Sequence, residues 1–173
     1  MKKTNIVWMA LACGMTVAGF APPKQIEKHH QPIQQTRTKM DNNFNEEQKK
    51  VFSTIQRMVA AFEAKDIDGV LATYENNAIV MFEPQKPVQG KENLRAAFTQ
   101  FVGMNPQYTF SGHEVYVSGD IATHVAPWKM TGHLHDGTKI EQSGLSVAVL
   151  RKQSNGGWLM IQDNPHGQLL LNQ

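Results

Sequence analysis

Two ionisable side chains of the sequence could carry acid–base chemistry. Alternation of residue type places His124 on one strand face with Trp128 and Met130, and this face is expected to be buried. On the last predicted strand, Asp163 is expected to share a face with Ile161, opposite Met160 and Gln162. Because burial can bring the pKa values of both groups toward neutrality, the pair could act as general acid and general base. The alternative is that His124 is a core histidine and that Asp163 is a buried acid bonded to the backbone or to Tyr74.

A second group of polar residues has the spacing of a metal site. His133 and His135 form a His-x-His pair followed by Asp136, which would suit a transition metal if a third ligand converged. The pair lies beside a predicted Asp-Gly turn, where exposure is expected, so we predict solvated side chains and no metal. We find no Gly-rich phosphate loop, no Gly-x-Ser-x-Gly elbow and no cysteine besides Cys13. No cofactor is therefore expected.

Residues 1–21 have the composition of a secretory signal peptide. Two lysines precede an apolar stretch and a run of small residues that ends at Ala21, so we expect cleavage there and export across a bacterial inner membrane. The mature protein would then be periplasmic or secreted. The alternative is a lipoprotein anchored at Cys13, because Ala-Leu-Ala-Cys resembles a lipid-processing box. Contact with a membrane is expected only in that case.

Residues 22–43 have few large apolar side chains and are predicted to form a flexible leader. The whole chain carries 17 Lys plus Arg against 15 Asp plus Glu. Residues 1–21 contain two of these bases and no acid, and residues 22–43 contain four bases and two acids, which leaves 11 bases and 13 acids in the remainder. A domain with this net charge of −2 has no excess of positive charge for a polyanion, so no nucleic-acid partner is expected.

Residues 44–173 combine helical and strand periodicities and are predicted to form one α+β domain. The expected elements are helices at 45–64, 66–74 and 91–101, a strand at 78–82, a proline-containing loop at 83–90, and four hairpin-connected strands from Tyr108 onward. Three N-terminal helices would thus pack on a mainly antiparallel sheet, and the sheet would position His124 and Asp163.

Three segments match motifs of a known superfamily. They are Arg57–Ala78 (RMVAAFEAKDIDGVLATYENNA), Gly90–Leu94 (GKENL) and Trp158–Asn164 (WLMIQDN). These segments resemble the nuclear transport factor 2-like superfamily, and most of all its SnoaL-like and ketosteroid-isomerase-like branches. The resemblance implies a cone-shaped α+β fold with a curved sheet, and it covers essentially the whole predicted domain.

The resemblance also allows the isomerase site to be compared residue by residue. The two oxyanion-hole positions fall on Met58 and Ala148, and neither side chain can donate a hydrogen bond. A supporting tyrosine falls on Phe98, whereas Tyr74 retains a hydroxyl, and Glu83 stands nearest to the position of the general base. Steroid isomerisation is therefore disfavoured, because the oxyanion hole usually supplies the largest catalytic contribution.

In this fold the concave face of the sheet and the helices enclose a ligand pocket. We predict a binding module for a small apolar or aromatic molecule, with the ligand contacts Tyr74, Trp128, Met130, Gln142 and Met58. The alternative is a cofactor-independent cyclase, dehydratase or isomerase that uses His124, Asp163 and Glu83. The resemblance also implies a homodimer, formed through the outer face of the sheet.

Overall fold

The computed structural model describes residues 43–134 and 136–172 of the chain. The predicted signal peptide at 1–21, including Cys13, and the predicted leader at 22–43, except for Asn43, lie outside the described residues. None of the helices that the structure describes is both long and apolar enough to cross a membrane.

Helix α2 (Glu46–Glu63) begins at a capping box formed by two side chains. Asn45 Oδ1 accepts from the backbone N–H of Gln48 at 3.0 Å, and Gln48 Oε1 accepts from the backbone N–H of Asn45 at 2.9 Å. Two N–H groups that the helix itself cannot satisfy are thereby bonded. The expected helix at 45–64 is confirmed, and its buried face carries Val51, Ile55 and Phe62.

Helices α3 (Ile67–Leu71) and α4 (Lys91–Val102) follow as expected, with one correction. The prediction that the second helix continues through Tyr74 is wrong, because Tyr74 is the first residue of strand β1. Tyr74 pairs there with Met160 of the parallel strand β7, and this long-range pairing outweighs the local helical pattern.

Seven strands form one curved sheet in the described residues. They are β1 (Tyr74–Glu83), β2 (Lys86–Gln89), β3 (Gln107–Phe110), β4 (Glu114–Ser118), β5 (Ile121–His133), β6 (Lys139–Lys152) and β7 (Trp158–Asn164), and a 3₁₀ helix, η1 (Gly167–Asn172), follows. The strand order is β2-β1-β7-β6-β5-β3, with β4 also paired to β5. Only the β1–β7 pair is parallel, so the sheet is mainly antiparallel, as predicted.

Two predictions about strands are wrong. The segment 83–90 is not simply a loop, because β2 pairs with β1 and places Pro87 opposite Met81. A proline is tolerated there because β2 is an edge strand, where one row of backbone groups needs no partner in the sheet. Five strands, rather than four, lie between Tyr108 and the end of β7, because β3 and β4 pair separately with β5.

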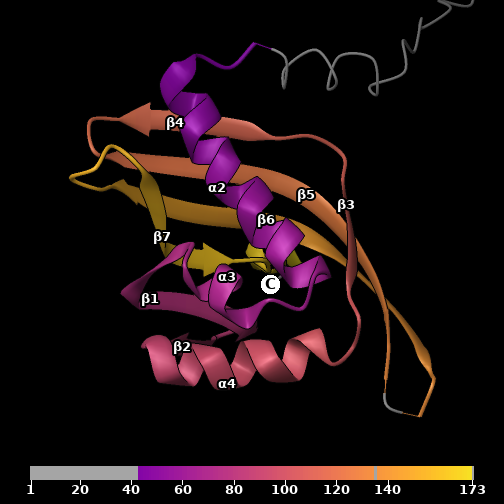
Figure 1. Ribbon diagram of the computed structural model, residues 1–173. Coiled ribbons are helices and arrows are strands. Elements are labelled where there is room, and N and C mark those ends of the chain that lie inside the picture. The colour runs from indigo at the N-terminus through magenta and orange to yellow at the C-terminus, as the bar shows by residue number, and fades with distance from the viewer. Residues whose placement is uncertain (1–42, 135, 173) are drawn as a thin grey trace, which may run out of the picture. The chain divides into compact units, whose positions relative to one another are not determined.

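The three helices lie on one side of the curved sheet (Figure 1). Helix α2 crosses the concave face of the sheet, and α4 packs beside β1 and β2. Along β5 the buried positions alternate with more exposed ones, so His124, Trp128 and Met130 face the helices as the sequence pattern predicts. The cone-shaped α+β architecture expected from the sequence is confirmed.

Candidate functional site

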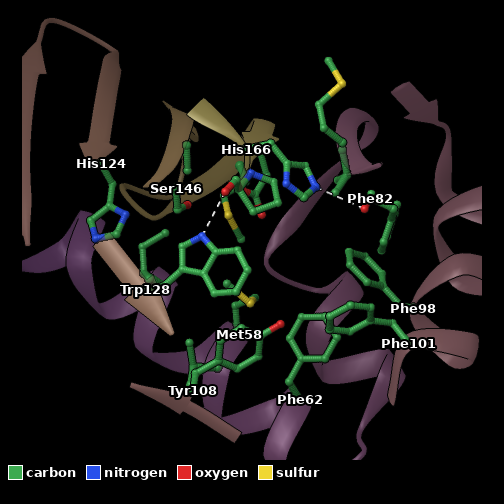
Figure 2. A pocket seen from close by; sticks show the side chains of 18 of the residues that line it. Met58, Phe62, Phe82, Phe98, Phe101, Tyr108, His124, Trp128, Ser146 and His166 are labelled. Atoms are coloured by element: carbon green, nitrogen blue, oxygen red, sulfur yellow. Dashed lines mark hydrogen bonds between the residues drawn. The ribbon is translucent and has the colours of Figure 1, made fainter. Parts of the chain in front are cut away.

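A cavity of about 100 Å³ lies between the helices and the concave face of the sheet. Aromatic side chains make up much of its wall, as Figure 2 shows for Phe62, Phe82, Phe98, Phe101, Tyr108 and Trp128. No lysine, arginine or glutamate is among the described residues that line it. The cavity therefore suits an apolar group and offers no permanent positive charge to an anion.

The polar part of the cavity is built around Asp163 of β7. Its side chain is 8% exposed, and Tyr74 Oη donates a hydrogen bond to Asp163 Oδ2 at 2.9 Å. Burial raises the pKa of Asp163 above its usual value, although the Tyr74 hydroxyl, the charge of His166 and the Ser146 hydroxyl each act to lower it. The pKa of Tyr74 is raised as well, chiefly by burial. The carboxyl group is thus biased toward its protonated form.

A β-bulge aims Asp163 into the cavity. The β6–β7 register shifts between Val149 and Leu150, so that Val149 pairs with Gln162 and Leu150 pairs with Met160. We expected Ile161 to share the face of Asp163 and Met160 to point the opposite way, and this prediction is wrong. Met160 and Asp163 both line the cavity because one extra residue on β7 breaks the period of two between them.

His166 also lines the cavity, and the sequence did not single it out. His166 Nε2 lies 3.2 Å from the carbonyl oxygen of Phe82, which can only accept a hydrogen bond (Figure 2). The bond therefore places a proton on Nε2 and leaves a lone pair on Nδ1 when the ring is neutral. The signal that could have identified His166 is its position directly after Pro165, where the chain leaves β7.

His124 lies at the β5 side of the same cavity. Its side chain is 1% exposed, and its Nε2 lies 3.0 Å from Nδ1 of His113. Burial, assisted by the neighbouring His113, lowers the pKa of His124 to about 3. His124 is therefore neutral near pH 7.

The sheet register relates the two predicted acid–base residues directly. His124 of β5 pairs with Ala148 of β6, and Ala148 pairs with Asp163 of β7. The backbones of His124 and Asp163 are thus two strand spacings apart, which is about 10 Å. Since alanine is the residue between them, the cavity has space above the middle strand.

Trp128 forms one wall of the cavity, as predicted. Its indole N–H donates to the carbonyl oxygen of Pro165 at 2.9 Å, which holds the ring in place. Gly144 allows this close packing, because a Cβ there would lie 3.0 Å from Trp128 Cζ2 and 2.6 Å from the Pro165 oxygen. No pattern in the sequence singles out Gly144 as a residue that shapes the site.

The other predicted site residues divide into two groups. Met58, Tyr74 and Gln142 line the cavity. Met130 is buried but is not one of the lining residues, and Glu83 is an exposed residue at the β1–β2 turn, where it pairs with Lys86. Lys86 lowers the pKa of Glu83. The structure therefore does not bring Glu83 together with His124 and Asp163.

Of the His-x-His pair considered for metal binding, His135 lies outside the described residues. Within residues 43–134 and 136–172, no three His, Cys, Asp or Glu side chains are grouped as metal ligands would be.

A curved sheet whose concave face and covering helices enclose an apolar cavity defines the nuclear transport factor 2-like class of α+β proteins. The model of the SnoaL-like domain family matches residues 55–157. The chain belongs to this family, as the sequence motifs predict.

Solved structures agree with this assignment. A ketosteroid isomerase-like protein from Erwinia carotovora atroseptica is 24% identical with a TM-score of 0.61, over 70% of this chain and 95% of that chain. A nuclear transport factor 2 (NTF2-like) superfamily protein from Salmonella enterica serovar Typhimurium is 15% identical with a TM-score of 0.63, over 68% and 88% of the two chains. No match was found among curated proteins. These low identities establish a shared fold and not a shared activity.

Proposed function

We propose that the protein binds a small, uncharged, apolar or aromatic molecule in the cavity. The observation that carries this proposal is the composition of the wall, in which aromatic rings surround one polar cluster of Asp163, Tyr74 and His166. Burial of apolar surface would supply most of the affinity, and the polar cluster would orient the ligand. When Asp163 is protonated, its O–H can donate a hydrogen bond to a ligand carbonyl oxygen, and burial favours that form by raising the pKa of Asp163.

The volume of the cavity limits the size of the ligand. An engineered apolar cavity of about 150 Å³ accepts benzene, so a cavity of about 100 Å³ must widen by the movement of wall side chains to hold an aromatic ring. Met58 and Met81 are part of the wall, and their unbranched side chains can change rotamer to admit a slightly larger molecule.

Calorimetry with two matched probes tests the proposal. Acetophenone carries a neutral carbonyl on an aromatic ring, and benzoate carries a carboxylate on the same ring. We expect acetophenone to bind at pH 8 and benzoate to bind at least tenfold more weakly, since no described lysine or arginine lines the cavity. Equal affinities, or no binding of either probe, would contradict the proposal.

Proton transfer without a cofactor is the second candidate function. It is favoured by the raised pKa of Asp163 and by the presence of His166 in the same cavity. A carboxylate with a raised pKa is a stronger base once it is ionised, and it could remove a proton next to a ligand carbonyl.

Exchange of the methyl protons of acetophenone in D₂O, followed by ¹H NMR, tests this second function. Catalysis predicts exchange well above the buffer rate, and it also predicts that Asp163→Asn reduces the rate at least a hundredfold. If acetophenone binds but its methyl protons exchange only at the buffer rate, proton transfer is contradicted and only the binding function remains supported.

We also propose that the protein is exported and forms a homodimer. These two proposals are supported by the sequence of residues 1–21 and by the family of the domain. The intact mass of the protein from a periplasmic extract would distinguish cleavage after Ala21 from lipidation at Cys13. Light scattering of the mature chain tests the dimer.

A further inference from the structure

One buried side-chain nitrogen of a residue that lines the cavity has no hydrogen-bond partner in the described part of the chain. It is Nδ1 of His124, a residue that is 1% exposed. Figure 2 shows the His124 ring on the β5 side of the cavity, with Trp128 and Ser146 between it and His166. Buried polar atoms are nearly always bonded, so an unpaired one beside a cavity needs a partner that the described residues do not supply.

The other nitrogen of His124 is held by His113. The 3.0 Å separation between His124 Nε2 and His113 Nδ1 requires one proton between the two atoms when both rings are neutral. If His124 donates this proton, its Nδ1 is a lone pair. If His113 donates it, Nδ1 of His124 carries a buried N–H without an acceptor. An orphaned buried N–H is rarer than an under-satisfied acceptor, so the first arrangement is favoured.

The packing around the two rings holds this arrangement in place. Phe52 of α2 contacts His113, with 4.6 Å between the ring centroids, and lies 6.3 Å from the centroid of His124. Phe110 also contacts His113, with 5.1 Å between the ring centroids. The two imidazoles therefore have little freedom to turn, and the lone pair on His124 Nδ1 keeps its direction.

We propose that His124 Nδ1 accepts a hydrogen bond from a hydroxyl or N–H group of the ligand, and that His113 is the positioning residue that keeps the proton on His124 Nε2. This inference rests on the proposed binding function and narrows the class of ligand. The ligand is a small aromatic or apolar molecule with a hydrogen-bond donor directed toward β5. The polar cluster of Asp163, Tyr74 and His166 would then contact either a second polar group of the ligand or an apolar edge of the ligand.

Long-range ¹H–¹⁵N NMR of the histidine side chains tests the inference without any ligand. At pH 8 we expect a pyridine-like Nδ1 and a pyrrole-like Nε2 for His124. His113→Gln, which retains an acceptor for the Nε2 proton, should preserve this pattern. His113→Phe, which removes the acceptor, should mix the two tautomers. A pyrrole-like Nδ1 in the unaltered protein would overturn the inference.

Phenol and anisole then test the role of the donor, because anisole is phenol with its hydroxyl proton replaced by a methyl group. Phenol should bind roughly three- to tenfold more tightly than anisole and should shift the Nδ1 resonance of His124. In His124→Phe the two affinities should become equal.

The remaining outcomes separate the two proposals. If both probes bind equally and the Nδ1 resonance does not move, the inference fails while the proposed binding function stands. If phenol binds better but His124→Phe keeps the preference, the donor is bound elsewhere and the inference fails. If neither probe binds and acetophenone does not bind, the proposed function fails and the inference fails with it.

Discussion

Ala148→Val is the most direct test of whether the cavity is usable space. Ala148 is 1% exposed, lines the cavity and lies between His124 and Asp163 in the sheet register. Valine adds two methyl groups at a position in a central strand, where a β-branched side chain is well tolerated. The added atoms would enter the cavity rather than displace packed neighbours.

The expected gain in stability follows from two estimates. Burying two methyl groups contributes about 1.6 kcal/mol at about 0.8 kcal/mol each. A cavity term of about 24 cal/mol per Å³, applied to a volume of about 100 Å³, sets an upper limit of about 2.4 kcal/mol for filling the whole cavity. We therefore expect the free energy of unfolding to rise by about 1–2 kcal/mol.

The matched control is Ala122→Val on β5. Ala122 is also 1% exposed and belongs to the same buried core as Ala148, but it does not line the cavity. Added methyl groups there should overpack the core and lower the free energy of unfolding by about 1–3 kcal/mol. The two variants thus differ in the sign of the effect, although the residue change and the burial are the same.

Urea denaturation of both variants, followed by circular dichroism, measures the difference through the midpoint at an unchanged m-value. Calorimetry with acetophenone gives a second readout, in which Ala148→Val should weaken binding at least tenfold. The reasoning is refuted if Ala148→Val is destabilised as much as Ala122→Val, or if it binds acetophenone with unchanged affinity.

Single contacts elsewhere allow further tests by the same denaturation assay. Tyr74→Phe removes the hydrogen-bond donor to Asp163 and should lower the free energy of unfolding by about 1–3 kcal/mol. The control Tyr116→Phe, at an exposed residue, should lower it by less than about 0.5 kcal/mol. Equal losses would contradict a stabilising bond between Tyr74 and Asp163. Because the pKa of Asp163 is raised in the folded state, this group favours folding most at low pH, and its contribution is lost as the pH rises from the usual carboxyl range through the folded pKa. Asp163→Asn should remove that fall in stability, and an unchanged pH profile would argue against the raised pKa. Asn45→Ala deletes the N-cap of α2 and should cost about 0.5–2 kcal/mol; no loss would show that the capping box is unimportant in solution.

The fold could largely be predicted from sequence because its strongest signals are local. The helical spacing behind Asn45 and the alternation around His124 each involve neighbouring residues, and both patterns match the buried faces of α2 and β5. The exceptions were Tyr74, the segment 83–90 and the separate strands β3 and β4, where pairing with another strand determined the conformation. Local propensity carries no information about such partners.

The sequence by itself determined the family, most of the elements and the residues of β5 that face the helices. The tertiary structure alone decided how the site is assembled. A β-bulge placed Met160 and Asp163 on the same side of the sheet, and the carbonyl of Phe82 oriented His166. His113, which lies between β3 and β4, came within hydrogen-bond distance of His124 on β5. The tertiary structure also left Glu83 on the surface with Lys86. These outcomes depend on strand register and on contacts between distant segments, whereas residue periodicity records only which face of its own element a side chain occupies.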